Sequence, residues 1–390
     1  MHVPFTRDSS SDPKLGSEED LRAEGDLDLD LAAPSPPQPT TTPQDKAAIA
    51  DLVAKYGGPA ATAWLEFDRY MIWRPSDPIP ESSFPPVQGY MRHDPYVFAW
   101  GKPLVSDSAA LLPTAKAFAA WAEAENVRPI WCVVDDEFQR VLASSPFEWS
   151  VVECVYEEVM DPAHVIDIIG TESEAARKEA ASSVVKDLKK NLRRAEREDV
   201  QIKEMDLKQW PEEDKRAVEQ GIVDWKNART GVQIAATSGE PWVDTEHRRY
   251  WVARKDEKPV GLLILTPVHG NAWQIKNSIS FPDAPRGTSE ALIYTALSDI
   301  HRESGPDQPD ASVSFGLTAA EEMNPTQNIS GWKVTLLKSL YGKVTSAGGL
   351  LRRGEFRSKF DPELESIYVC YPQDGFGLHG VKALIRQLKK

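Results

Sequence analysis

The stretch "GGLLRRGEFRSKFDP" near the C-terminus concentrates positive charge in a chain that is acidic as a whole. Arg353, Arg357 and Lys359 lie within seven positions around a glycine, in a protein whose formal net charge is -15. Arginine can bind a phosphate through two parallel hydrogen bonds, and glycine lets the backbone approach it closely. We expect the alternation in "FRSKF" to place Arg357 and Lys359 on one face of a strand, where they bind an anion. Surface salt bridges to neighbouring acids are the alternative.

A second basic run, "VVKDLKKNLRRAERE", has the spacing of an amphipathic helix. Its apolar residues fall on one face, and the other faces carry cations. Phosphate contacts supply most of the non-specific affinity for nucleic acid, although charge runs are usually only solvated surfaces. The cations that could make such contacts include Lys189, Lys190, Arg193 and Arg194.

The length and composition indicate a globular protein of about two domains. Of its 390 residues 41% are hydrophobic, which is enough for large cores. Residues 1–45 hold ten acids against three basic residues amid Pro, Ser and Thr, so we expect a disordered tail there. No apolar run approaches the roughly 20 residues of a membrane span. We therefore expect a cytoplasmic protein, one that at most touches membranes peripherally.

Apolar spacing and turn residues predict two successive units of strands and helices. The first covers residues 46–173, and a basic connecting helix follows over 174–199. The second unit, 200–390, repeats the order of elements, with antiparallel hairpins and helices laid on the sheet. We predict an α/β (α+β) fold of tandem acetyltransferase-like (GNAT) units, each a mixed, mostly antiparallel sheet flanked by helices.

The junction between the last hairpin and the next helix argues against coenzyme A as a cofactor. A coenzyme A enzyme of this fold needs a Gly-rich loop there, because backbone amides must approach the pyrophosphate. The junction reads "FPDAPRGTSEAL", with one glycine. A P-loop for ATP is missing as well, and neither the three cysteines nor His269, His301 and His379 have metal-binding spacing. We expect no cofactor and no metal.

Four segments of the second half resemble the C-terminal catalytic domain of bacterial lysyl- and alanyl-phosphatidylglycerol synthases. They are "KKNLRRAEREDVQI", "PDAPRGTSEALI", "SVSFGLTAAEEMNP" and "RRGEFRSKFDPELESIYV". Two others, "SFGLTAAEEMNPTQNISGW" and "YVCYPQDGFGLHGVKALI", are similar to the stand-alone fungal ergosteryl-glycine synthases.

The resemblance implies transfer of an amino acid from aminoacyl-tRNA to a lipid hydroxyl. The expected partners are Gly-tRNA, ergosterol in a membrane, and a synthetase supplied in trans. It also implies that Arg353, Arg357 and Lys359 hold the acceptor end of the tRNA, aided by the basic helix.

The resemblance has one departure, in the strand before the Pro-Arg-Gly turn. Bacterial members carry an Asp-Leu-Met-Arg-like segment there, and Asn277 and Ile279 stand in place of its Asp and Arg. An anionic headgroup needs a cation at that place, so the change favours a neutral sterol over phosphatidylglycerol. The residues expected to position the substrates are Lys276, Asn277, Arg286, Asn324 and Asn328.

The implied reaction exchanges one ester for another. The enzyme must position the alcohol, help to remove its proton and stabilise the oxyanion. No Ser-His-Asp pattern is present, which indicates direct attack by the lipid hydroxyl. Glu290 and Glu321 are the candidate proton acceptors. The alternatives are a helix-start capping role for Glu290, a solvated helix-start position for Glu321, and proton transfer through the free ribose hydroxyl.

Three alternatives to this function stay open. The first is transfer to phosphatidylglycerol or of another amino acid, the second is a non-catalytic tRNA- or lipid-binding module, and the third, disfavoured by the missing loop, is coenzyme A-dependent N-acetylation.

The amphipathic C-terminal segment "HGVKALIRQLKK" could rest on a membrane or dock on its own domain. Asn328 could donate to a substrate carbonyl or cap a helix.

Overall fold

The computed structural model describes residues 43–170, 183–228, 239–305, 310–330, 354–373 and 376–388, together with residues 334, 338 and 341. The predicted acidic tail up to residue 42 and the predicted phosphate ligand Arg353 lie outside this described part. So do the first residues of the predicted connecting helix, which is seen from Ser183 onward.

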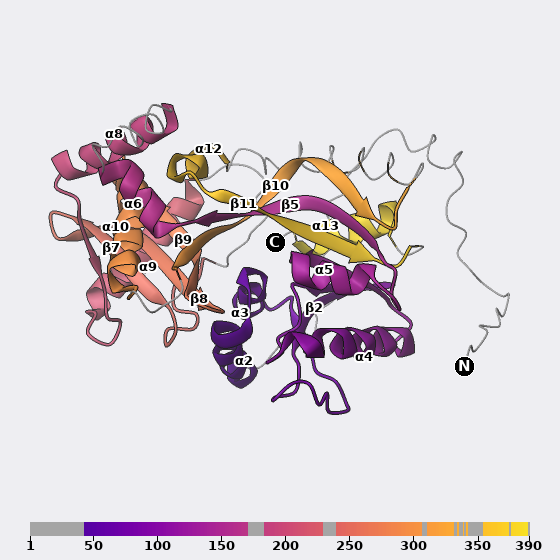
Figure 1. Ribbon diagram of the computed structural model, residues 1–390. Helices are drawn as coiled ribbons and strands as arrows, with labels where there is room; N and C mark the ends of the chain where they lie inside the picture. Colours follow the sequence, from indigo (N-terminus) through magenta and orange to yellow (C-terminus); the bar gives the residue numbers. More distant parts are fainter. Residues whose placement is uncertain are drawn as a thin grey trace, which may run out of the picture. The chain divides into compact units, whose positions relative to one another are not determined.

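In the part of the chain that the structure describes, eleven strands form one sheet in the order β1-β2-β3-β4-β11-β5-β10-β9-β8-β7-β6 (Figure 1). The strands are β1 (Met71–Trp73), β2 (Gln88–His93), β3 (Tyr96–Trp100), β4 (Arg128–Val134), β5 (Ser150–Met160), β6 (Gln201–Glu204), β7 (Arg249–Lys255), β8 (Lys258–Val268), β9 (Ala272–Ser280), β10 (Ser312–Gln327) and β11 (Glu363–Tyr371). Two neighbouring pairs are parallel and the other pairs are antiparallel, as expected. The predicted class of a mixed, mostly antiparallel sheet flanked by helices is confirmed.

The two halves of the sheet repeat one connectivity. An antiparallel meander β1-β2-β3 is followed by helix α4 (Leu111–Ala124) and by β4, which is parallel to β3. In the same way the meander β7-β8-β9 is followed by α10 (Thr288–Glu303) and by β10, which is parallel to β9. Apart from the edge strand β6, the strand order reads the same from either end when β1 to β5 are matched with β7 to β11.

The centre of the sheet is built by strand exchange between these halves. Strand β11, from the C-terminal half, lies between β4 and β5, and β5 in turn lies between β11 and β10. The three long strands β5, β10 and β11 run side by side in Figure 1. The predicted boundary between units at 173/174 stays a prediction, and the sheet is continuous across it.

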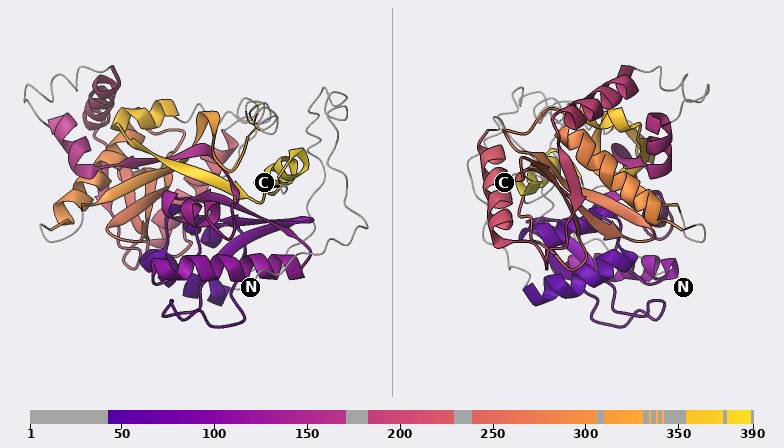
Figure 2. Two further views of the ribbon diagram at one scale, coloured as in Figure 1. Left: turned by 45° about the vertical axis from the view of Figure 1, so that its right-hand side comes forward. Right: turned by 90° about the vertical axis from the view of Figure 1, so that its left-hand side faces the viewer.

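Helices cover both faces of the sheet because its strands alternate apolar side chains between them. In the C-terminal half α10 packs on one face with Trp251 and Leu263, and α9 (Glu212–Asn227) packs on the other with Tyr250 and Leu262 (Figure 2). In the N-terminal half α4 and α5 (Asp136–Ala143) cover one face, and α2 (Pro43–Tyr56) and α3 (Ala63–Glu66) cover the other. The remaining α-helices in the described ranges are α6 (Pro162–Gly170), α8 (Ser183–Arg197), α12 (Gly354–Arg357) and α13 (Leu378–Leu388).

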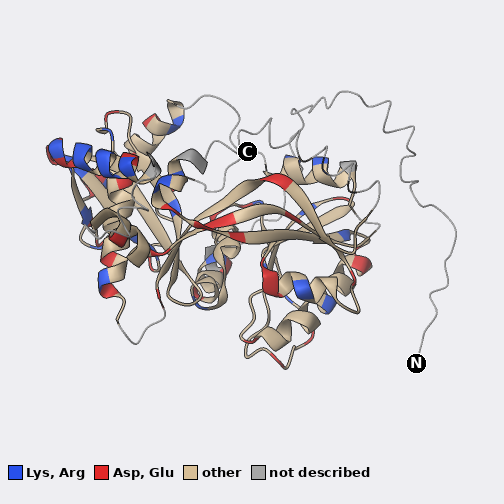
Figure 3. Cartoon of the chain, turned by 45° about the horizontal axis from the view of Figure 1, so that its top comes forward, with Lys and Arg blue, Asp and Glu red and all other residues tan. Residues whose placement is uncertain are grey.

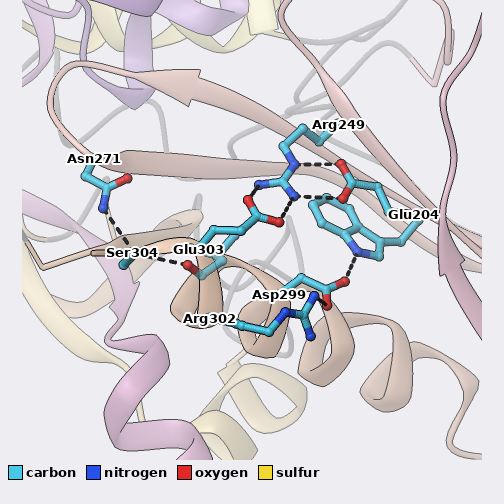
Figure 4. Close-up of polar contacts among 9 residues, drawn as sticks. Glu204, Arg249, Asn271, Asp299, Arg302, Glu303 and Ser304 are labelled. Carbon is cyan, nitrogen blue, oxygen red and sulfur yellow. Dashed lines mark hydrogen bonds and ion pairs between the residues drawn. The ribbon is translucent and has the colours of Figure 1, made fainter. Parts of the chain in front are cut away.

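One charged side chain holds α10 against the sheet. Arg249 on β7 donates two hydrogen bonds of 2.7 Å to Glu204 on β6 and two of 2.8 and 2.9 Å to Glu303 at the end of α10 (Figure 4). Trp251 beside it donates to Asp299 of the same helix at 2.8 Å. Because Arg249 satisfies two carboxylates at once, the end of α10 is fixed relative to β6 and β7.

Two local predictions are wrong. "FRSKF" is not a strand: it forms α12 and a 3-10 turn over Ser358–Phe360, because Phe356 and Phe360 are four residues apart and pack together on a helical face. The helix start considered for Glu321 is the second: strand β10 continues to Gln327, since it pairs with β5 along most of its length. Glu321 therefore stands within a strand and not at a helix start.

The C-terminal helix α13 docks on its own domain. Its Ala383 is buried in the core of the N-terminal half, and Val381, Leu384 and Leu388 pack against that core. Within the described residues, no helix combines the length and apolarity that a membrane crossing requires.

Candidate functional site

The parallel pairing of β9 with β10 is short and ends at a pair of β-bulges. The strands pair from Ser312 opposite Ala272 to Ser314 opposite Gln274. Just beyond, Lys276 is the extra residue of a bulge against β8, since its neighbours on either side pair with consecutive β8 residues. Phe315 is the extra residue of a bulge against β5. Bulges beside a point where strands separate are common at functional sites, because they redirect side chains.

Gly316 completes the bulge on β10. Its φ of 88° lies in the left-handed region, and an added Cβ would come within 3.3 Å of Gln274 Nε2. Its amide donates to Ser314 Oγ at 2.8 Å. The glycine therefore lets the backbone turn at the level where the two strands part.

Lys276 is buried at this point with polar but uncharged contacts. Its Nζ donates to Thr62 Oγ1 at 2.9 Å and lies 3.5 Å from Gln274 Oε1, and Thr62 donates to the same Gln274 oxygen at 2.5 Å. Burial lowers the pKa of Lys276 to about 8, although the nearby carboxylate of Glu66 raises it. The predicted positioning residue is thus an ammonium group that is close to losing its proton.

Glu157 on β5 is the buried acid of the same region, and the sequence analysis missed it. It accepts a hydrogen bond of 2.5 Å from Ser314 Oγ, and burial raises its pKa to about 7. Lys276 and Arg357 both lie close enough to lower that pKa electrostatically. The available signal was the "YEEVM" segment, which sets two adjacent acids inside a strand and so turns one of them toward each face of the sheet.

The predicted phosphate ligands that are described are both engaged with buried acids. Arg357 donates to Glu158 on β5 at 2.5 Å, and its guanidinium lies 5.6 Å from the centre of the Phe315 ring. Lys359 forms an ion pair of 2.7 Å with Glu290. Both cations thus form salt bridges, but with buried acids on β5 and α10 that are distant in the sequence and not with the neighbouring surface acids of the alternative.

Glu290 lies in the first turn of α10, where the sequence placed it, and is buried. It accepts from Asn191 Nδ2 of α8 at 2.8 Å as well as from Lys359. Through these contacts Glu290 joins α8, α10 and the turn after α12, and its role as a proton acceptor stays a prediction.

Helix α8 presents the predicted basic surface. Its apolar residues Val185, Leu188 and Ala195 are buried, as the periodicity predicts. Lys190 and Arg193 are exposed, and Lys189 and Arg194 are half-buried. The helix stands out as a blue row in Figure 3. This surface adjoins the Glu290–Lys359 ion pair through Asn191.

The other predicted residues are not brought into this arrangement. Glu321 and Arg286 are exposed, and the exposed Asn324 lies 3.4 Å from Glu153. Asn328 donates to the carbonyl oxygens of Ala143 and Trp149, both at 2.9 Å, so its amide ties the loop after β10 to the end of α5. Asn277, by contrast, is buried on β9 beside Lys276.

Comparison with solved structures shows a shared fold. The C-terminal domain (DUF2156) of a putative lysylphosphatidylglycerol synthetase from Agrobacterium fabrum matches with a TM-score of 0.63 and 17% identity, over 88% of this chain and 96% of that chain. L-PGS from Bacillus licheniformis matches with a TM-score of 0.65 and 15% identity, over 91% and 98%. A protein of unknown function from Bacteroides thetaiotaomicron matches with a TM-score of 0.52 and 11% identity, over 85% and 98%.

No curated protein sequence matches the chain significantly. One family model does match, and it spans residues 89–371, which include strands of both halves and the whole region where β9 and β10 part. The chain therefore belongs to the family described as phosphatidylglycerol lysyltransferase, C-terminal.

Proposed function

We propose that this protein is an aminoacyltransferase that moves an amino acid from aminoacyl-tRNA to the hydroxyl group of a membrane lipid. The observation that carries the proposal is the family membership over residues 89–371, which covers both halves of the sheet. The reaction replaces one ester by another, so activation by a separate synthetase suffices and the proposal includes no ATP, coenzyme A or metal.

The site where β9 and β10 part supports this chemistry. It combines a buried acid, Glu157, with a buried ammonium, Lys276, beside the two bulges. Ester transfer needs a proton acceptor for the attacking hydroxyl and a positive group for the oxyanion. The basic face of α8 supports contact with tRNA phosphates, because it is exposed in an otherwise acidic protein.

For the acceptor we propose a sterol, and ergosterol in particular, with glycine as the amino acid. Ile279, which stands where the bacterial segment has its Arg, is only 1% exposed in an apolar core and offers no cation. Lys276 is engaged with Thr62 and Gln274. A neutral lipid with a hydroxyl group fits these surroundings. The choice of glycine as the amino acid is based on the resemblance of the segments quoted above.

Phosphatidylglycerol is the second candidate acceptor, and one observation favours it. Lys276 keeps a positive charge below about pH 8 and could turn from Thr62 toward a phosphate. The family description itself names phosphatidylglycerol.

Reconstitution separates these candidates. The purified chain is incubated with radiolabelled Gly-tRNA and liposomes that contain either ergosterol or phosphatidylglycerol, in parallel with Ala-, Asp- and Lys-tRNA. We expect RNase-sensitive transfer of label from Gly-tRNA to a neutral lipid in the ergosterol liposomes. Label in phosphatidylglycerol would show that this phospholipid, and not ergosterol, is the acceptor. No transfer with any pair of tRNA and lipid would overturn the proposal that the protein is an enzyme.

A further inference from the structure

Glu157 differs from the other buried glutamates in its lack of a counter-charge. Four glutamates are buried in the described part of the chain: Glu66, Glu157, Glu158 and Glu290. Arg248, Arg357 and Lys359 form direct ion pairs with Glu66, Glu158 and Glu290 in that order. Among the described residues, Glu157 has no cation within ion-pair distance. A purely structural carboxylate in this place would destabilise the fold, because burial of an unpaired charge is unfavourable.

The hydrogen bonds around Glu157 orient it as an acceptor. Ser314 Oγ accepts from the amide of Gly316 at 2.8 Å, and its own proton is directed to Glu157 Oε1 at 2.5 Å. Within the described residues, the second carboxylate oxygen has no hydrogen-bond partner. That oxygen is therefore available to a group of a bound substrate, next to the point where β9 and β10 separate.

We propose that Glu157 is the general base of the transfer reaction and that Ser314 is its positioning residue. This inference rests on the proposed function. Glu157 takes the proton of the lipid hydroxyl as the hydroxyl oxygen forms its bond to the ester carbonyl carbon. When the tetrahedral intermediate collapses, the bond from that carbon to the ribose oxygen breaks, and Glu157 returns the proton to the ribose oxygen. The carboxylate is regenerated, and no further reactant is needed.

The groups that face Glu157 determine whether a substitution nearby raises or lowers its pKa. They are Ser314 on β10, Glu365 on β11, Lys276 on β9 and Arg357 on α12. The Ser314 hydroxyl and the two cations favour the carboxylate, and the charge of Glu365 opposes it. Glu365 pairs with Glu157 across the strands and is exposed. Glu365→Gln is therefore the matched variant, because it makes the same substitution at a neighbouring residue that solvent reaches.

The test measures single-turnover transfer from aminoacyl-tRNA to liposomal lipid between about pH 5.5 and 8.5 in the wild-type protein and in Glu157→Gln, Ser314→Ala and Glu365→Gln. The wild-type rate should rise with pH through about pH 7, because the carboxylate form of Glu157 is the active one, and it should level off or fall near pH 8, where Lys276 loses its proton. Glu157→Gln should lose about 10²- to 10⁴-fold and abolish this rise. Ser314→Ala should move the rise to higher pH, and Glu365→Gln should move it to lower pH.

The outcomes are separable. If the wild type transfers and Glu157→Gln keeps its rate and its pH dependence, Glu157 is not the base and the proposed function stands. If the wild type transfers to no lipid, the proposed function fails and this inference falls with it. If Glu157→Gln does not fold, the pH profiles of Ser314→Ala and Glu365→Gln decide. Shifts of the rate rise in opposite directions support the assignment, and shifts in the same direction, or no shift, overturn it.

Discussion

At the scale of single residues, Lys276 shows how stability and the candidate site oppose each other. It is 5% exposed, and its contacts are to the uncharged Thr62 and Gln274. Burial of a charge in such surroundings lowers the free energy of unfolding, as is common for residues that act on a substrate.

Replacement of this lysine by an apolar residue should stabilise the protein and stop transfer. The pKa of Lys276 is about 8 in the folded chain against 10.5 as the ordinary value, so between these pH values the unfolded chain binds more protons and stability rises with pH. Lys276→Met should therefore raise the free energy of unfolding at pH 7 by on the order of 1 to 3 kcal/mol. Urea unfolding at pH 7 and at pH 10 measures this, and the gain should shrink at the higher pH. A gain that grows with pH would contradict the argument.

At the scale of secondary-structure elements, the junction of α8 with α10 decides where the basic surface lies. Gly287, just before α10, has a φ of 95°, and a Cβ added there would lie 2.1 Å from the carbonyl oxygen of Asn191 in α8. Glu290 accepts a hydrogen bond from the side chain of the same Asn191. The two helices therefore touch through backbone, without room for a side chain.

Gly287→Ala should push α8 away from α10. We expect a loss of more than about 1 kcal/mol of stability, since both the clash and the left-handed backbone disfavour alanine. Thermal unfolding and tRNA affinity should both decline. Gly305→Ala, after the end of α10, is the matched control, because nothing lies within 4 Å of its added Cβ. Equal melting temperatures for the two variants would show that α8 does not depend on this contact.

The basic face of α8 should contribute to tRNA binding through charge. Lys190→Glu is expected to weaken tRNA binding several-fold. It should also reduce the slope of log Kd against the logarithm of the salt concentration by about 1, the value for one phosphate contact. Lys116→Glu on α4, which is also exposed, changes the net charge equally at a site away from α8. Binding isotherms of both variants at several NaCl concentrations give the comparison. Identical curves would mean that only the net charge of the protein matters.

At the scale of the whole described molecule, strand exchange makes the two halves interdependent. β4 and β5 do not pair with each other but flank β11, and β10 and β11 flank β5. Each half alone would leave strands of the central sheet without their neighbours, and such edges are prone to aggregate.

Fragments 1–182 and 183–390 should accordingly fail to fold separately. Expressed alone, each is expected to be insoluble or to lack cooperative unfolding. Expressed together, they should associate and recover the circular dichroism of the intact chain. Cooperative unfolding of an isolated fragment would show that the halves are independent domains, as the boundary predicted from sequence implies.

Much of this protein is determined by its sequence alone. Local periodicity and turn chemistry predicted most helices and strands, the antiparallel hairpins and the amphipathic helix α8, because these depend on near neighbours in the chain. The four segments that resemble the bacterial synthases led to the family that the comparison found.

Only the tertiary structure decided how distant residues are paired. The insertion of β11 between β4 and β5, the engagement of Glu290 by Lys359, and the isolation of Glu157 beside Ser314 join residues far apart in the sequence. The ionisation of a carboxylate depends on its burial and its charged neighbours. Those are properties of the packed sheet, and no spacing of residues along the chain records them.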